Sequence, residues 1–190
     1  KFLFFVTKQG IIKRTTFDEY ENINKNGKIA IKLNEDDELA FVRSTDGNAE
    51  IIIAGSNGKA VRFLENTVRP LGRTARGVKG FNVDGGYVIG LATNLEGEYI
   101  LTITENGFGK DYRMTRRGAR GVKTVNVTEK SGKLVCMRAV RGDEDCMIMT
   151  AGGIVIRISL NQVSVYSRSA QGVKVINVKD DIVSSVAILE

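Results

Sequence analysis

Apolar residues along this chain alternate with polar ones or form short runs, a pattern that predicts β-strands and no long helix. Four strand-like runs recur, at residues 2–7, 51–56, 99–104 and 146–150. Each is followed by a glycine that we call a turn glycine: Gly10, Gly58, Gly107 and Gly153. Asn-Gly pairs at two of these turns are typical of tight hairpins, whose central residues need positive φ. Each turn therefore predicts a β-hairpin.

A basic segment built around a further glycine follows each hairpin. These glycines are Gly27, Gly77, Gly121 and Gly172. Alternating runs come next and predict another short strand, at residues 29–33, 81–83, 125–127 and 176–178. A last strand contains Leu39, Val88, Leu134 or Val183. The turn glycines, the basic-segment glycines and the last strands thus recur together every ~48 residues, which indicates true repeats. A repeat of this length cannot bury its apolar face alone.

Four short strands in each of four repeats predict an all-β, propeller-like radial array. An open sandwich is the structural alternative, but it would not require three registers to repeat. We expect one domain over residues 1–190, with blades near 1–48, 49–97, 98–144 and 145–190. The interval from Gly107 to Gly121 is shorter than its counterparts. The sequence leaves open whether a loop is shorter there or residues are missing.

Composition is that of a soluble globular chain, with 42% hydrophobic and 26% charged residues. No apolar run is long enough to span a membrane. The chain opens inside a strand-like run, so we expect it to be part of a longer polypeptide. Cys136 and Cys146 lack metal-ligand spacing, and histidine is absent. These features predict neither a disulfide framework nor a zinc site, and they suit a reducing cytosol.

The net charge of +6 points to a polyanionic partner, although a solvated surface with a small excess of bases is an equal alternative on charge alone. Bases and acids are segregated, because residues 68–80 and 113–123 are basic whereas 35–38, 143–145 and 180–181 are acidic. In a radial fold the basic segments would form a band. The candidate phosphate-binding residues are Arg69, Arg73, Arg76, Lys79, Arg113, Arg116, Arg117, Arg120, Lys123 and Lys174, with Lys25, Lys28 and Lys32 as weaker candidates.

A blade-by-blade band of this kind suits a bent duplex whose phosphates are held by lysine and arginine. Aromatic residues make up only 7% and tryptophan is absent, which disfavours a stacking platform for single strands. Glycines beside the arginines allow close backbone approach to phosphate. The alternative is that these arginines form ion pairs with acids of neighbouring blades. No histidine-dependent nucleophile, metal site or phosphate-binding P-loop is present in the sequence.

Four phrases, at residues 24–33, 68–80, 104–110 and 170–174, carry a specific resemblance. They are similar to the C-terminal domain of the gyrase A protein of bacterial DNA gyrase and to its paralogue in topoisomerase IV, over essentially the whole chain. The resemblance implies a β-pinwheel, a propeller-like ring whose blades exchange strands. It also implies that duplex DNA is bent or wrapped around a basic rim.

Several functional expectations follow from the resemblance to gyrase. The domain itself would be non-catalytic and cofactor-free, and would support ATP-dependent negative supercoiling by a holoenzyme of two A and two B subunits. ATP and Mg²⁺ would belong to that holoenzyme. The partners would be duplex DNA, the B subunit, and the rest of the A subunit, in the bacterial cytoplasm at the nucleoid. The alternatives are a topoisomerase IV domain that selects DNA for relaxation or decatenation, and a propeller-type module that binds an acidic protein.

The family's signature box reads Gln, two basic residues, Gly-Gly, a basic residue and Gly. Residues 115–121 match it at five of seven positions, with Thr115 and Ala119 as the departures. The box-like residues are Thr115, Arg116, Arg117, Gly118, Ala119, Arg120 and Gly121. In gyrases the box lies on the first blade, whereas here it would lie on a later one. We expect its arginines to touch phosphate still, and the departures keep topoisomerase IV open.

Overall fold

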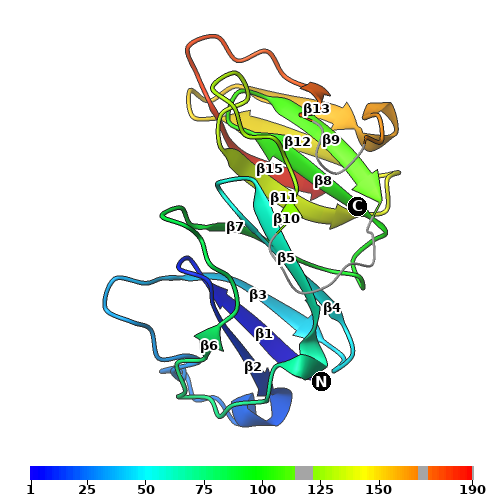
Figure 1. The fold of residues 1–190 in the computed structure, drawn as a ribbon. Coiled ribbons are helices and arrows are strands. Elements are labelled where there is room, and N and C mark those ends of the chain that lie inside the picture. Colours follow the sequence, from blue (N-terminus) through cyan, green and yellow to red (C-terminus); the bar gives the residue numbers. More distant parts are fainter. Residues whose placement is uncertain (114–121, 167–170, 190) are drawn as a thin grey trace.

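The computed structural model describes residues 1–113, 122–166 and 171–189 and consists mainly of short antiparallel strands (Figure 1). Each repeat opens with a hairpin: β1 (Phe2–Thr7) and β2 (Ile11–Thr16), β4 (Glu50–Gly55) and β5 (Lys59–Leu64), β8 (Tyr99–Thr104) and β9 (Phe108–Arg113), β12 (Asp145–Thr150) and β13 (Val155–Ser159). A further strand pairs with the first strand of each hairpin: β3 (Leu39–Thr45), β7 (Val88–Thr93), β11 (Leu134–Val140) and β15 (Val183–Leu189). Short 3₁₀ helices follow three hairpins: η1 (Phe17–Tyr20), η2 (Glu65–Thr67) and η3 (Leu160–Gln162). The predicted all-β class is confirmed.

Successive repeats exchange a strand. We call β6 (Val78–Lys79), β10 (Val122–Lys123) and β14 (Val173–Lys174) the exchanged strands. Each comes from one repeat and pairs with the hairpin of the preceding repeat, on β2, β5 and β9 respectively. The sheets are therefore β3-β1-β2-β6, β10-β5-β4-β7 and β11-β8-β9-β14, while the described part of the last one is β13-β12-β15.

The exchanged strands begin three residues earlier than the alternating runs predicted, and residues 29–33 form no strand. The turn glycine explains the early end of each strand. The Gly10 carbonyl accepts the N–H groups of both Gly80 and Phe81, at 3.0 and 3.1 Å, which ends the ladder. Gly10 has φ +83°, and a Cβ there would lie 2.2 Å from the Phe81 carbonyl oxygen. Only glycine fits this turn, because it allows both the positive φ and the close approach.

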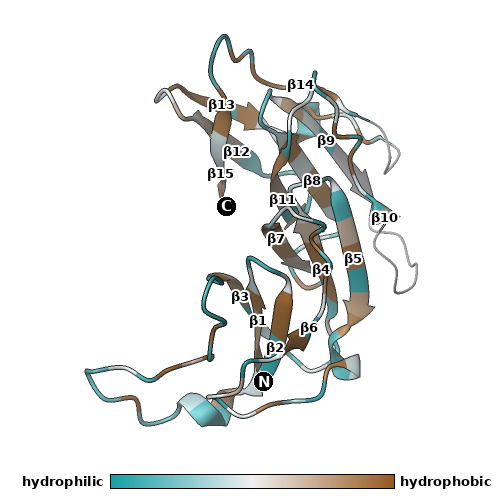
Figure 2. Cartoon of the chain, turned by 60° about the vertical axis from the view of Figure 1, so that its left-hand side comes forward, coloured by the Kyte–Doolittle hydropathy of each residue, from teal (hydrophilic) through white to brown (hydrophobic). Residues whose placement is uncertain are grey.

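The four sheets follow one another along an arc (Figures 1 and 2). Neighbouring sheets contact each other through β3 and β7, β7 and β11, and β11 and β15. These strands therefore line the inner side of the arc. Since the exchanged strands lie at the opposite edge of their sheets, they occupy the outer side, which confirms a propeller-like arrangement.

Apolar cores fill the spaces between successive sheets. The central strand β4 shows how one strand serves two of them: Ile51 and Ile53 enter the first cluster, whereas Ile52 and Ala54 enter the next. Side chains of a strand alternate between the two faces, so both faces of this sheet are buried. The third cluster contains Cys146 and Cys136, which are both buried.

Candidate nucleic-acid interface

Three lysines occupy equivalent places on the exchanged strands. Lys79, Lys123 and Lys174 are each the second residue of their strand, and each is exposed. Their registers match as well, because each lysine pairs with the hairpin residue that directly follows the turn glycine. Lys79 pairs with Ile11, Lys123 with Lys59 and Lys174 with Phe108. The fold therefore repeats one exposed ammonium along the outer side of the arc.

Local backbone geometry fixes each of these lysines. Directly after the exchanged strand, two successive N–H groups converge on the carbonyl of a turn glycine: Thr124 and Val125 on Gly58, and Val175 and Ile176 on Gly107. Val125 and Ile176 are buried between sheets. The lysine therefore lies between a buried anchor and the basic segment, with its side chain directed to solvent.

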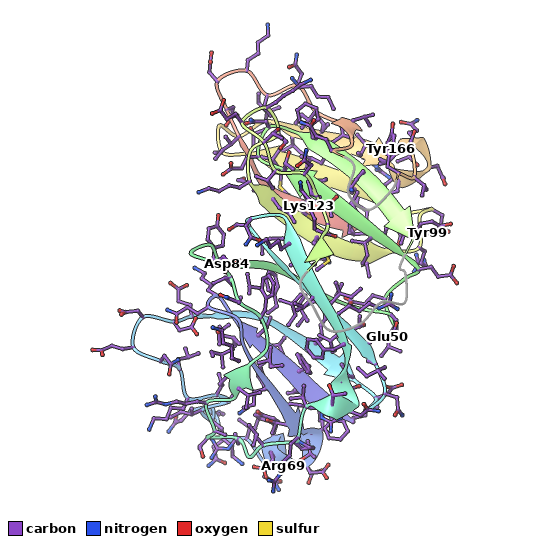
Figure 3. All side chains as sticks on the ribbon, viewed as in Figure 1. Glu50, Arg69, Asp84, Tyr99, Lys123 and Tyr166 are labelled. Atoms are coloured by element: carbon purple, nitrogen blue, oxygen red, sulfur yellow. The ribbon has the colours of Figure 1, made fainter. Side chains whose placement is uncertain are left out.

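The basic segment of the second repeat contributes three more of the predicted residues. Arg69 and Arg76 are exposed and Arg73 is half-buried. Arg69 and Lys79 line one open groove of about 410 Å³ together with Val61, Phe63 and Val78. Figure 3 shows Arg69 and Lys123 at different points along the arc, so the predicted cations are spread along the molecule.

Residues 25–34 of the first repeat, which we call the first basic segment, lie against residues 68–80, the second basic segment. The Arg73 guanidinium donates to the Ile29 carbonyl at 2.5 Å, and Arg76 donates to the Asn34 side-chain oxygen at 3.2 Å. The Lys32 backbone N–H donates to the Ala75 carbonyl at 3.2 Å. The weaker candidates Lys25, Lys28 and Lys32 are all exposed. The structure thus brings the candidates of two repeats into one neighbourhood.

The alternative of ion pairing with neighbouring blades can be checked residue by residue. Ion pairs in the described part of the chain involve Lys8, Arg14, Arg43, Lys59, Arg62, Arg141 and Arg157. Within residues 1–113, 122–166 and 171–189, none of them includes Arg69, Arg73, Arg76, Lys79, Lys123 or Lys174. The positive charge of these six side chains is not neutralised by a carboxylate there.

Part of the predicted site lies outside the described residues. The whole box-like motif, residues 115–121, lies there, and so do residues 114–120 of the shorter interval from Gly107 to Gly121. Arg113 ends β9, where its backbone pairs with Tyr99. The roles of Arg113, Arg116, Arg117 and Arg120 stay predictions.

Sequence reasoning missed one basic residue at this site. Lys13 on β2 is fully buried, with its ammonium beneath the two basic segments. The sequence did contain a signal of this burial. The residue three places after the turn glycine is Lys13, Val61, Lys110 or Ile156 in the four repeats, so the position is aliphatic in two of them. A position that alternates between lysine and an aliphatic residue is typical of an interior position. Lys110 is fully buried too.

Two further observations bear on function. Over the described residues there is no group of three or more His, Cys, Asp or Glu side chains placed to hold a metal ion. In the same part of the chain, no helix is long and apolar enough to cross a membrane.

Comparison with known proteins identifies the family. The family model for the DNA gyrase C-terminal domain, a beta-propeller, matches four times, at residues 1–46, 49–94, 98–141 and 144–190. The A subunit of DNA gyrase from Staphylococcus epidermidis is 46% identical over 195 aligned positions, which cover 98% of this chain and 22% of that protein. The chain thus spans about a fifth of the length of the curated relatives it matches.

Solved structures agree on the fold. A DNA gyrase A C-terminal domain superposes with a TM-score of 0.85 at 26% identity, over all of this chain and 66% of that one. The C-terminal domain of a DNA topoisomerase IV superposes with a TM-score of 0.90 at 24% identity, over all of this chain and 62% of that one. From the repeated match of the family model and from the Staphylococcus relative, we conclude that the chain belongs to the DNA gyrase C-terminal domain family.

Proposed function

We propose that this chain binds duplex DNA along the outer side of its arc and bends it, as the DNA-wrapping part of a gyrase A protein. The observation that carries the proposal is the recurrence of Lys79, Lys123 and Lys174 at one place in three successive sheets, exposed and without a carboxylate partner among the described residues. A duplex that follows the arc would meet an ammonium from each of these sheets. Such contacts hold phosphates and respond to the shape and stiffness of the duplex more than to its bases.

In this proposal the domain is non-catalytic and needs no cofactor. It presents bent DNA to the rest of the A subunit, which acts with the B subunit in an A₂B₂ holoenzyme. That holoenzyme uses ATP and Mg²⁺ to introduce negative supercoils in the bacterial cytoplasm, at the nucleoid. Gyrase is favoured over topoisomerase IV because the 46% identical relative belongs to a gyrase, whereas both kinds of solved domain share the fold.

The direct test measures binding of this chain to duplexes from about 20 to about 150 base pairs, the upper length being about one persistence length. We expect affinity to increase with duplex length and to fall steeply with salt. In a ligation assay with short fragments, the chain should promote circle formation. Binding that is indifferent to both length and salt, with no gain in circles, would overturn the proposal and favour an acidic protein as the partner.

A further inference from the structure

Lys13 is a lysine with no exposed surface. Its ammonium donates to the backbone carbonyls of Ala30 at 2.5 Å, Arg73 at 2.6 Å and Gly72 at 3.3 Å. An ammonium has three N–H donors, and burial is costly unless each finds an acceptor. Here all three are satisfied, and all three acceptors belong to the backbone of the basic segments.

The carbonyls that Lys13 joins come from two different repeats. Ala30 lies in the first basic segment, and Gly72 and Arg73 lie in the second. Neither stretch is a strand, so no sheet ladder holds these carbonyls. The Tyr20 hydroxyl also donates to the Ala30 carbonyl, at 3.1 Å. The Leu71 N–H also ties the second segment to the Arg14 carbonyl of β2 at 2.8 Å, but the three carbonyls that Lys13 binds are held from the sheet side by side chains.

We propose that Lys13 is a positioning residue for the candidate interface, which holds the basic segments of the first two repeats together from beneath. The proposal rests on the proposed DNA binding. Lys13 cannot contact a phosphate itself because it is buried. Its effect would pass through the placement of Arg73 and of its neighbours Arg69 and Arg76.

The charge state of Lys13 gives this role a dependence on pH. The pKa of Lys13 is lowered to about 8, first by burial and then by the nearby Arg73 guanidinium, while Glu19 acts in the opposite direction. The groups that act on the ammonium are Glu19 from η1, Arg73 from the second basic segment and the Phe5 ring from β1, and the Tyr20 hydroxyl shares the Ala30 carbonyl with it. Above pH 8 the neutral amine has one donor fewer and no charge, so its hold on the three carbonyls weakens.

The first readout needs no DNA. In Lys13→Met, amide hydrogen exchange at Lys32, whose N–H bonds to the Ala75 carbonyl, should be faster by at least about tenfold. The matched control is Lys8→Met, which removes the same charge from an exposed turn where Lys8 pairs with Glu38 at 2.7 Å. The control should leave exchange at Lys32 unchanged. Equal exchange in wild type and Lys13→Met would overturn the proposal.

The second readout is the pH profile of duplex binding. At pH 7 Lys13→Met should bind about tenfold more weakly than wild type, and the ratio of the two affinities should approach one as pH rises from 7 to above 9. The effects of groups that titrate in both wild type and Lys13→Met cancel in this ratio of affinities. A merely structural loss would give a constant ratio, and that result would refute positioning by the charged form.

Two outcomes separate this inference from the proposed function. If wild type fails to bind any duplex, the DNA-binding proposal fails, and exchange at Lys32 alone decides whether Lys13 holds the segments. If Lys13→Met does not fold, the wild type serves instead: exchange at Lys32, divided by the intrinsic exchange rate at each pH, should rise as pH passes 8 and Lys13 loses its proton. No rise across that range would overturn the proposal.

Discussion

The hairpin strands and the exchanged strands of this fold place their basic residues in opposite environments. Arg14, Arg62 and Arg157 each stand four residues after a turn glycine, and each forms an ion pair with a carboxylate. In contrast, the lysines at the second position of β6, β10 and β14 are exposed and have no such partner among the described residues. In the first two sheets the two sets lie on neighbouring strands, β2 beside β6 and β5 beside β10.

The difference shows that position within the repeat, and not charge alone, separates structural bases from those available to a ligand. A base four residues after the turn glycine lies near acids of its own hairpin or of the next repeat, as Arg62 does with Glu50 and Arg14 with Glu65. Its charge is cancelled locally. The exchanged strands lie at the outer edge of their sheets, so the positive potential that could steer a polyanion concentrates there.

The largest expected effect belongs to the buried pair of the first set. Glu65 is fully buried and accepts hydrogen bonds from the Thr45 hydroxyl and from the N–H groups of Gly47 and Ala49, beside the Arg14 guanidinium at 3.8 Å. Glu65→Ala would leave these donors unpaired and the Arg14 charge uncompensated. We expect a loss of about 3–5 kcal/mol in the free energy of unfolding, measured by urea denaturation.

Glu50→Ala is the matched control for that experiment. Glu50 pairs with Arg62 at a partly exposed site, with 26% of its side chain accessible. Its removal should cost no more than about 1 kcal/mol. Similar losses in the two variants would show that burial does not distinguish these ion pairs.

The second prediction concerns the exchanged strands. Changing Lys79, Lys123 and Lys174 together to Gln should leave stability nearly unchanged, because the three side chains are exposed. The affinity for a long duplex should fall by at least about tenfold, and the slope of log affinity against log salt should become less steep by about 2.7, or 0.9 for each lost phosphate contact.

Replacement of the same three lysines by Arg provides the control, since it preserves the charge. Salt dependence should then match that of wild type. If the Gln variant keeps the full slope, these lysines do not contact phosphate, and the contrast between the two strand types would have no functional meaning.

Local patterns predicted the hairpins, the turn glycines and the last strand of every repeat, because these features depend on residues close in sequence. Leu39, Val88, Leu134 and Val183 each begin the strand expected there. The early position of the exchanged strands could not be found in this way. A strand of two residues has no periodicity, and its end depends on a glycine carbonyl from the preceding repeat. Burial of Lys13 was missed because a single repeat does not show that its position is aliphatic elsewhere.

The smallest expected effect concerns the last sheet, where the ion-paired arginine of the hairpin differs least in exposure from the lysines of the exchanged strands. Arg157 on β13 pairs with Asp145 at 2.6 Å, but 65% of its side chain is accessible, and β13 is an edge strand in the described part of the chain. Exposed pairs contribute about 0–1 kcal/mol, so Arg157→Gln should barely change stability.

The same variant tests whether an ion pair with a carboxylate keeps a base from binding DNA. If it does, duplex affinity and its salt slope should also stay at the wild-type values in Arg157→Gln. A slope less steep by about 0.9 would instead show that Arg157 contacts phosphate. Exposure at the outer edge, and not the lack of an acidic partner, would then be what selects the bases that bind DNA.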